Sequence, residues 1–174
     1  SLSGSNLREF SVATWAYLDS ATDWQRIFDF GSSNTNYMAM MIVANTLRFE
    51  MYLGNSRQAM ETPIPPLRRW VHLAVTFSGN WATIYLNGAP VKSIYYTFNP
   101  TQFTLTQNYL GKSRFSDPLF KGQLDDFRLY NRGLSAAEVS TLVTNAPSLP
   151  PYNLVAGSFG TKVALTWEGV VNAT

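Results

Sequence analysis

Apolar and polar residues alternate along much of this chain, which places every second side chain on the same side of an extended backbone. The alternating segments are rich in aromatic and β-branched residues and are separated by turn residues, as is typical of half-buried β-strands. They read FSVATWAYL, NYMAMMIV, LRFEMYL, WVHLAVTF, WATIYL and FRLY. This pattern predicts an all-β fold.

Dipeptides in the connections favour tight β-hairpins. Gly54-Asn55, Gly79-Asn80 and Asn87-Gly88 contain residues that tolerate a positive φ, which two-residue hairpin turns require. The prediction is clearest between Trp81 and Val91, where a strand, a turn and a second strand follow one another.

One segment, residues 135–144, is predicted to be helical. Ser135 and Glu138 have the spacing of a capping box, which satisfies backbone N–H groups at the start of a helix. The apolar residues of this segment then share one face over about two turns; they are Leu134, Val139, Leu142 and Val143. Pro147 and the prolines beyond it end the segment.

The composition fits one globular domain and limits the classes of partner. The 174 residues are 45% hydrophobic and 14% charged, which is enough for one core and too little for two full domains. Lys and Arg number 13 against 11 Asp and Glu, without a long basic run, so a nucleic-acid partner is not expected. No apolar run approaches the roughly 20 residues that span a bilayer, so membrane insertion is not expected either.

The chain has no cysteine and a single histidine, His72. This composition excludes disulfide bonds, thiolate chemistry, cysteine-based zinc sites and multi-histidine metal centres. It also suits a secreted, periplasmic or cell-surface protein, which is the location we expect.

Four stretches that follow one another in the chain resemble a known family. FSVATWAYL, RIFDFGS, RRWVHLAVTFSGNWATIYLNGAPV and FKGQLDDFRLYNRGLSAAEV lie between residues 7 and 145. Together they are similar to the laminin G-like jelly-roll domains of the concanavalin A-like lectin and glucanase superfamily. The resemblance implies an antiparallel β-sandwich (jelly roll) of two sheets, one of them concave, with one short C-terminal helix.

The resemblance also divides the chain into two parts. Residues 1–146 are expected to form the laminin G-like domain, without the first strand that family members usually have. In residues 147–174, a proline linker precedes PYNLVA and VALTWEGV, which resemble the opening strands of a fibronectin type III module. We therefore expect the chain to be a piece of a larger multidomain protein.

Two adjacent aspartates, Asp125 and Asp126, stand in the closing strand-like segment. Neighbours on an extended strand point to opposite faces, whereas paired glycosidase carboxylates flank one bond at about 5 to 10 Å separation. An acid/base pair is therefore not expected. The resemblance implies that Asp125 is a ligand of one structural calcium ion, together with backbone carbonyls; the alternative is that it accepts backbone hydrogen bonds at a strand bulge or pairs with Arg128 or Arg132.

Aromatic residues make up 14% of the chain, more than a sandwich core of this size needs. Sugars stack their C–H faces on aromatic rings, while amide and charged groups hold their hydroxyls. Alternation gives three strands a face that carries polar and aromatic residues, and loop residues stand at its rim. The predicted carbohydrate-binding residues are Trp24, Arg48, Glu50, Tyr52, His72, Trp81, Tyr85 and Tyr109.

The function we expect is that of a non-catalytic carbohydrate-binding or accessory module. The parent protein would be a secreted or cell-surface glycan-processing protein such as a bacterial glycoside hydrolase. The partners would be a glycan or adjacent domains of the same polypeptide. An adhesion or protein-interaction module is the alternative, and an intrinsic glycosidase is a third hypothesis; the lone His72 and the missing nucleophile elbow do not favour a hydrolase.

Overall fold

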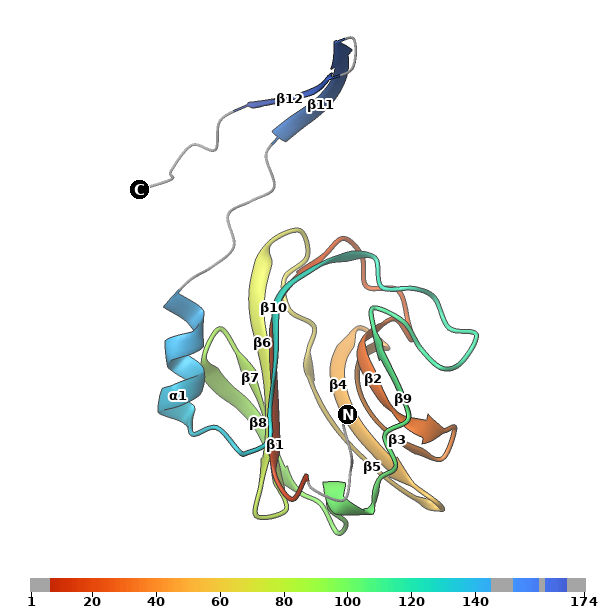
Figure 1. The fold of residues 1–174 in the computed structure, drawn as a ribbon. Helices are drawn as coiled ribbons and strands as arrows, with labels where there is room; N and C mark the ends of the chain where they lie inside the picture. Colours follow the sequence, from red (N-terminus) through yellow and green to blue (C-terminus); the bar gives the residue numbers. More distant parts are fainter. Residues whose placement is uncertain (1–6, 145–151, 160–161, 169–174) are drawn as a thin grey trace.

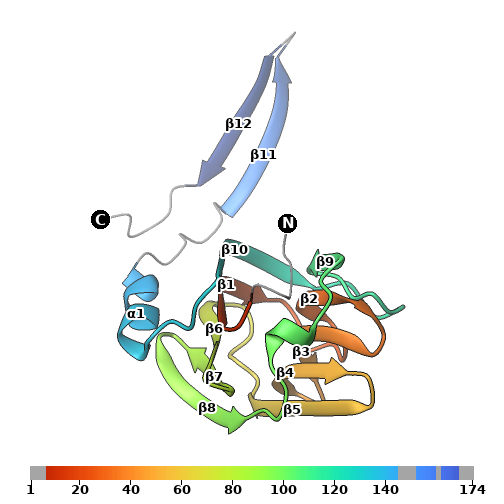
Figure 2. The ribbon, with the colours of Figure 1, turned by 60° about the horizontal axis from the view of Figure 1, so that its bottom comes forward.

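The computed structural model describes residues 7–144, 152–159 and 162–168, and in it residues 7–144 form a sandwich of two sheets (Figures 1 and 2). Sheet A has the strand order β10-β1-β6-β7-β8, and sheet B has the order β5-β4-β3-β2-β9. All neighbouring strands are antiparallel. The predicted antiparallel β-sandwich with one short helix is thereby confirmed.

The strands of the two sheets come largely from the segments that alternate. Sheet A contains β1 (Phe10–Leu18), β6 (Trp70–Ser78), β7 (Trp81–Leu86), β8 (Ala89–Tyr95) and β10 (Gly122–Tyr130). Sheet B contains β2 (Arg26–Ser33), β3 (Asn36–Val43), β4 (Thr46–Leu53), β5 (Ser56–Pro63) and β9 (Gln107–Leu110). Strands β1, β3 and β7 have the predicted bounds, whereas β10 begins five residues before FRLY.

The core lies between the sheets and consists of the residues that face inward at every second position. On β6 these are Val71, Leu73, Val75 and Phe77, all buried. The ring of Phe77 stacks on that of Phe10, with centroids 5.8 Å apart. Burial of each such side chain stabilises the fold by about 1.5–3 kcal/mol. The alternate residues of the same strands point outward and form the outer faces of the two sheets.

Two-residue turns with positive φ join neighbouring strands. The Asn87–Gly88 turn has φ values of 47° and 80°, and Leu86 pairs with Ala89 across it. Positive φ at both central residues is the mark of a type I′ turn, so the predicted hairpin is confirmed. The Gly79–Asn80 and Ala44–Asn45 turns also have two positive φ values. Ala44 gave no turn signal in the sequence, because alanine disfavours this region.

Helix α1 (Ala136–Thr141) continues into a 3₁₀ turn at Leu142–Thr144. It begins with the predicted capping box, in which Ser135 and Glu138 each accept a hydrogen bond from the backbone N–H of the other. Leu134 and Val139 pack on sheet A, so that α1 covers part of its outer face, on the side away from sheet B (Figure 1). In the described part of the chain, no helix is long and apolar enough to cross a membrane.

Residues beyond the sandwich form a separate pair of strands. Strands β11 (Tyr152–Phe159) and β12 (Lys162–Glu168) are antiparallel and correspond to the two strand-like pieces of the sequence. The predicted proline linker falls largely in residues 145–151, outside the described residues. The start of a fibronectin type III-like module stays a prediction.

Replacing Gly88 should destabilise the domain more than replacing Gly54. The φ values are 80° and 61°, so alanine at either position costs about 1–2 kcal/mol of backbone strain. A Cβ at Gly88 would also lie 3.0 Å from Cγ2 of Val143 and 3.1 Å from Cα of Ser140, whereas nothing lies within 4 Å at Gly54. Chemical denaturation should show the larger loss of unfolding free energy for Gly88→Ala. Equal losses would mean that the end of α1 moves aside at no cost.

Candidate functional site

The two outer faces of the sandwich divide the predicted carbohydrate-binding residues. Five belong to the side of sheet B: Trp24, Arg48, Glu50, Tyr52 and Tyr109. Three belong to sheet A: His72, Trp81 and Tyr85. The outer faces point away from each other across the core, so the eight residues do not form one surface. The expectation is corrected because alternation shows which residues share a side of a strand and not which sheet the strand joins.

On sheet A, only one of the three residues is accessible. Tyr85 is buried beneath α1, and His72 is 2% exposed with its ring edge-on to Trp15, at a centroid distance of 5.3 Å. Trp81 is 53% exposed and meets Tyr95 edge-on at 5.8 Å. This face therefore presents one exposed aromatic pair.

On sheet B, side chains of the outer face surround an open cavity of about 320 Å³. The residues come from the loop before β2, from strands β2 to β5, from the β2–β3 turn and from the loop between β9 and β10. The rings of Tyr52 and Phe115 each meet Tyr37 edge-on at 5.8 Å. The volume is within the roughly 300–1,000 Å³ of small-ligand sites. The lining residues are Trp24, Arg26, Asn34, Tyr37, Tyr52, Arg57, Phe115 and Asp117.

Trp24 lines this cavity in a strained backbone conformation. Its φ is 68°, in the region that favours glycine, and its side chain is among the exposed large apolar ones. Its N–H donates to the carbonyl oxygen of Ile42 at 2.7 Å, which fixes the loop to β3. Such backbone strain costs about 1–3 kcal/mol and is concentrated at functional sites. The ring is thus held where a ligand can reach it.

Asp29 on β2 is fully buried between two arginines. Nε and Nη2 of Arg114 donate to Asp29 Oδ1 at 2.9 and 2.7 Å, and Nε of Arg26 donates to Oδ2 at 3.4 Å. Both arginine side chains are 2% exposed. Arg26 Nη2 also lies 3.2 Å from Asp117 Oδ2, and its guanidinium carbon lies 5.8 Å from the Phe115 ring centroid. These contacts attach the β9–β10 loop to β2.

Glu50 on β4 is the second buried carboxylate of this face. Tyr37 Oη donates to its Oε1 at 2.5 Å, and Arg57 Nη2 donates to its Oε2 at 2.6 Å. Arg48 joins Glu50 to Glu61, with Nη1 3.4 Å from Glu50 Oε2 and Nε 2.7 Å from Glu61 Oε1. Burial and the bond to Glu50 raise the pKa of Tyr37, so its hydroxyl remains a proton donor.

The cavity thus combines ring surfaces with hydrogen-bond donors and acceptors. Arg57 is 47% exposed and has N–H groups that Glu50 does not use, and Asp117 supplies carboxylate oxygens. Such a set is suited to holding sugar hydroxyls beside the rings of Trp24 and Tyr52. Both buried carboxylates are held by guanidinium groups, which is unlike the arrangement of a glycosidase acid/base pair.

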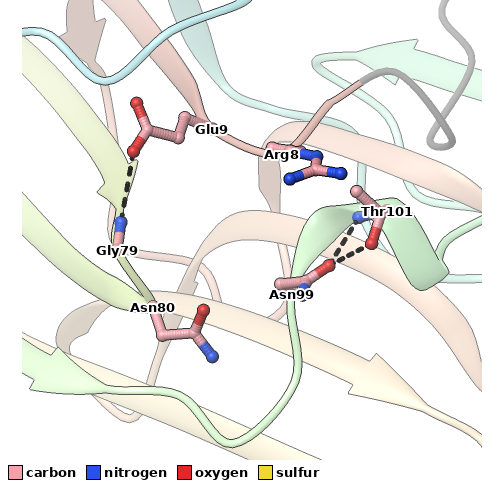
Figure 3. Close-up of a pocket in the computed structure, with 6 residues that line it drawn as sticks. All are labelled: Arg8, Glu9, Gly79, Asn80, Asn99 and Thr101. Atoms are coloured by element: carbon pink, nitrogen blue, oxygen red, sulfur yellow. Dashed lines mark hydrogen bonds between the residues drawn. The ribbon is translucent and has the colours of Figure 1, made fainter.

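A second cavity, of about 550 Å³, lies among the segment before β1, the β6–β7 turn and the 3₁₀ helix Pro100–Gln102 (Figure 3). Glu9 accepts hydrogen bonds there from Ser78 Oγ at 2.7 Å and Gly79 N at 3.3 Å, and the Ser78 bond above all lowers the pKa of Glu9. The lining residues are Arg8, Glu9, Gly79, Asn80, Asn99 and Thr101. None of these six is aromatic, so the cavity on sheet B is better suited to a sugar.

The predicted calcium ligand, Asp125, lies at a β-bulge of β10. Two residues of β10 stand opposite the single residue Thr14 of β1. Asp126 has a φ of 47°, and its N–H donates to Asp125 Oδ1 at 2.7 Å. Arg128 Nε donates to Asp126 Oδ1 at 2.7 Å. The bulge interrupts regular alternation, and both aspartates are exposed; the expectation that they face opposite ways is corrected for this reason.

The donors around Asp125 do not form a carboxylate-rich calcium site. Calcium takes about six to eight oxygen ligands, usually with several carboxylates. Across the described ranges, no three His, Cys, Asp or Glu side chains are grouped so that they could hold a metal ion. Asp126 is moreover paired with Arg128. Calcium binding by Asp125 stays a prediction.

Sequence reasoning missed several residues that line or support the cavity on sheet B. The sequence around Asp29 does contain a signal, namely a carboxylate between two phenylalanines in a strand. Such a carboxylate needs a partner when it is buried. No local pattern indicated that Arg114 and Phe115 return to β2, which lies 85 residues earlier in the chain. The missed residues are Arg26, Asp29, Tyr37, Arg57, Arg114, Phe115 and Asp117.

Comparison with known proteins shows the superfamily to which the fold belongs. A family model of laminin G type, described as the concanavalin A-like lectin/glucanases superfamily, matches residues 2–140. No curated protein matches the chain in sequence.

Solved structures with low sequence identity share the fold. Domain 4 of an extracellular arabinanase from Geobacillus stearothermophilus, in complex with arabinotriose, is 20% identical, with 79% of this chain and 67% of that chain covered and a TM-score of 0.66. A native heptameric SAP-like pentraxin from Limulus polyphemus is 20% identical, with 79% and 70% covered and a TM-score of 0.63. The IT-sialidase CBM40 of Ruminococcus gnavus, bound to α2,6 sialyllactose, is 13% identical, with 79% and 84% covered and a TM-score of 0.69.

Asp125→Ala should destabilise the domain by about 0.5–1.5 kcal/mol, because the bulge loses the hydrogen bond that Asp125 accepts. If Asp125 also binds calcium, a chelator should lower the Tm of the wild type and leave that of Asp125→Ala unchanged, since a ligand of the folded state stabilises it by mass action. A wild type whose Tm responds neither to chelator nor to added calcium would limit Asp125 to its structural role.

His72 should titrate below its ordinary range, because burial lowers its pKa more than the charge of Asp126 raises it, and Arg128 lowers it further. Between the lowered pKa of the folded state and about 6.5, the unfolded chain then binds more protons than the folded one, so stability falls as the pH drops through this window. His72 is the single histidine, so its Hε1 resonance is assigned without ambiguity. An NMR titration midpoint at or above about 6.5 would contradict the prediction.

Proposed function

The chain belongs to the concanavalin A-like lectin/glucanase superfamily, and we propose that it is a non-catalytic carbohydrate-binding module that holds its glycan on the outer face of sheet B. In this proposal, Trp24 and Tyr52 supply ring surfaces, while Arg57, Asn34 and Asp117 bind hydroxyl groups. Of the residues predicted from the sequence, Arg48 and Glu50 position the site, since they hold Arg57 and the neighbouring strands.

The observation that carries the proposal is the strained, exposed Trp24 beside a cavity with both donors and acceptors. A tryptophan at positive φ on a protein surface is unfavourable for folding in two ways, through backbone strain and through exposed apolar area. In this proposal, contact with a ligand accounts for both the strained backbone and the exposed ring of Trp24. The cavity is also open, as a site for one part of a longer chain requires.

Two of the structural neighbours support a glycan ligand in general terms. The arabinanase domain is in complex with arabinotriose, and the sialidase module is bound to α2,6 sialyllactose. We propose by analogy that this chain serves a larger, secreted or cell-surface protein, such as a bacterial glycoside hydrolase, next to further domains of the same polypeptide. Tyr109, which lies under the Lys112 ammonium at 5.2 Å, would extend the surface beyond the cavity.

An adhesion or protein-interaction module is the second candidate. The observation that favours it is the exposed Trp81–Tyr95 pair on sheet A, because exposed aromatic residues are common in protein interfaces. This surface lies on the other side of the sandwich, so the two functions can be tested separately.

Trp24→Ala should weaken oligosaccharide binding by about tenfold or more, as is common for a central aromatic contact. A glycan array identifies a ligand first, and isothermal titration then gives Kd for the wild type and the variant. Trp81→Ala is the matched control, because it removes an equally large exposed ring from the opposite face and should leave Kd unchanged.

The reverse result, with binding lost in Trp81→Ala and kept in Trp24→Ala, would move the site to sheet A. Unchanged Tm values for both variants ensure that the comparison concerns binding and not folding.

A further inference from the structure

We propose that the cavity on sheet B selects uncharged oligosaccharides and discriminates against acidic ones. This inference rests on the proposed function and concerns the ligand class of the same site. It follows from the charges on the outer face of sheet B and from what already neutralises them.

Cations and anions on this face are equal in number. Four guanidinium groups stand against four carboxylates, and each guanidinium has a carboxylate partner within 4.0 Å. Two flanking residues, Lys112 beside Tyr109 and Asp23 beside Trp24, add one charge of each sign. The eight charged residues are Arg26, Arg48, Arg57, Arg114, Asp29, Glu50, Glu61 and Asp117.

The two buried arginines of this face are not available as anion receptors. The side chains of Arg26 and Arg114 are 2% exposed, and their donors bond to Asp29 and Asp117. The remaining donors bond to Met41 Sδ and to the carbonyl oxygens of Ser33 and Gln107. An acidic sugar would have to replace a buried carboxylate, which would leave that carboxylate buried without its partner. Arg57 is the most accessible guanidinium, and it is already bonded to Glu50 at 2.6 Å.

The carboxylates add a direct penalty for an anion. Asp117 lines the cavity and is partly exposed, so a ligand carboxylate there would meet a like charge in a partly desolvated site. A neutral sugar avoids both penalties, because its hydroxyls donate to Asp117 and accept from Arg57 without displacing an ion pair. Paired charges therefore serve here as strong hydrogen-bonding groups for hydroxyls.

The test compares neutral and acidic oligosaccharides of matched size. Titrations of the wild type with arabinotriose, lactose and cellotriose are set beside titrations with 3′- and 6′-sialyllactose and trigalacturonate. The tightest neutral ligand should bind at least about tenfold more tightly than any acidic one. For lactose and sialyllactose, which share their neutral part, the added sialic acid should not improve binding.

Asp117→Asn is the diagnostic variant. It removes one negative charge from the lining while keeping the shape, so the ratio of acidic to neutral affinity should rise about tenfold, more at low salt than at high salt. Asp126→Asn is the control: it makes the same charge change on sheet A, at a positive φ that asparagine tolerates, and should leave the ratio unchanged.

Three results would overturn the inference. Acidic oligosaccharides that bind as tightly as neutral ones, with binding lost in Arg57→Ala, would show an anion site and leave the proposed function intact. An equal effect of Asp117→Asn and Asp126→Asn would show that charge in the cavity does not set selectivity. Absence of binding to every oligosaccharide would remove the proposed function together with the inference.

Discussion

The buried carboxylate of Asp29 is the interaction on which the candidate site depends. It lies on β2 with Arg26 and Arg114 on either side, and none of the three side chains is more than 2% exposed. Removing one partner from such a group typically destabilises a protein by about 3–5 kcal/mol, because a charge stays buried and unpaired. Asp29 therefore holds the β9–β10 loop on the sheet, and with it Phe115 and Asp117, which form one wall of the cavity.

The two outer faces of the sandwich are covered by different elements, a helix on sheet A and a loop on sheet B. On sheet A, an apolar helix face covers Ala13, Ala74 and Tyr85, as in the interior of a protein. On sheet B, a polar loop is attached through ion pairs, and its aromatic residue Phe115 packs edge-on against Tyr37. Helix packing leaves little room, whereas the loop attachment leaves an open cavity between Phe115 and Trp24. The difference explains why the face that lies away from the helix contains the open cavity.

The sequence contained most of the fold and only part of the site. Strands such as β1 and β7, the Asn87–Gly88 turn and the Ser135 cap depend on neighbouring residues, and local patterns predicted them. The cavity depends on pairing between β2 and a loop 85 residues away, which no local pattern contains. Likewise, alternation correctly grouped Arg48 with Glu50 and Tyr52, but His72 and Tyr85 belong to the other sheet. The bulge at Asp126 shows the same limit, since one extra residue shifts the faces that follow.

The stability of this face and its chemistry have a common origin. Two arginines can be buried on β2 and the β9–β10 loop only if carboxylates accompany them, and Asp29 and Asp117 meet that requirement. The same carboxylates then neutralise the guanidinium groups that an anionic ligand would need. In the proposed function, a charge arrangement that attaches a loop to a sheet thus also limits the ligands that the cavity can hold. In the proposed function, aromatic rings, with Trp24 kept exposed despite its positive φ, supply most of the binding energy for a neutral chain.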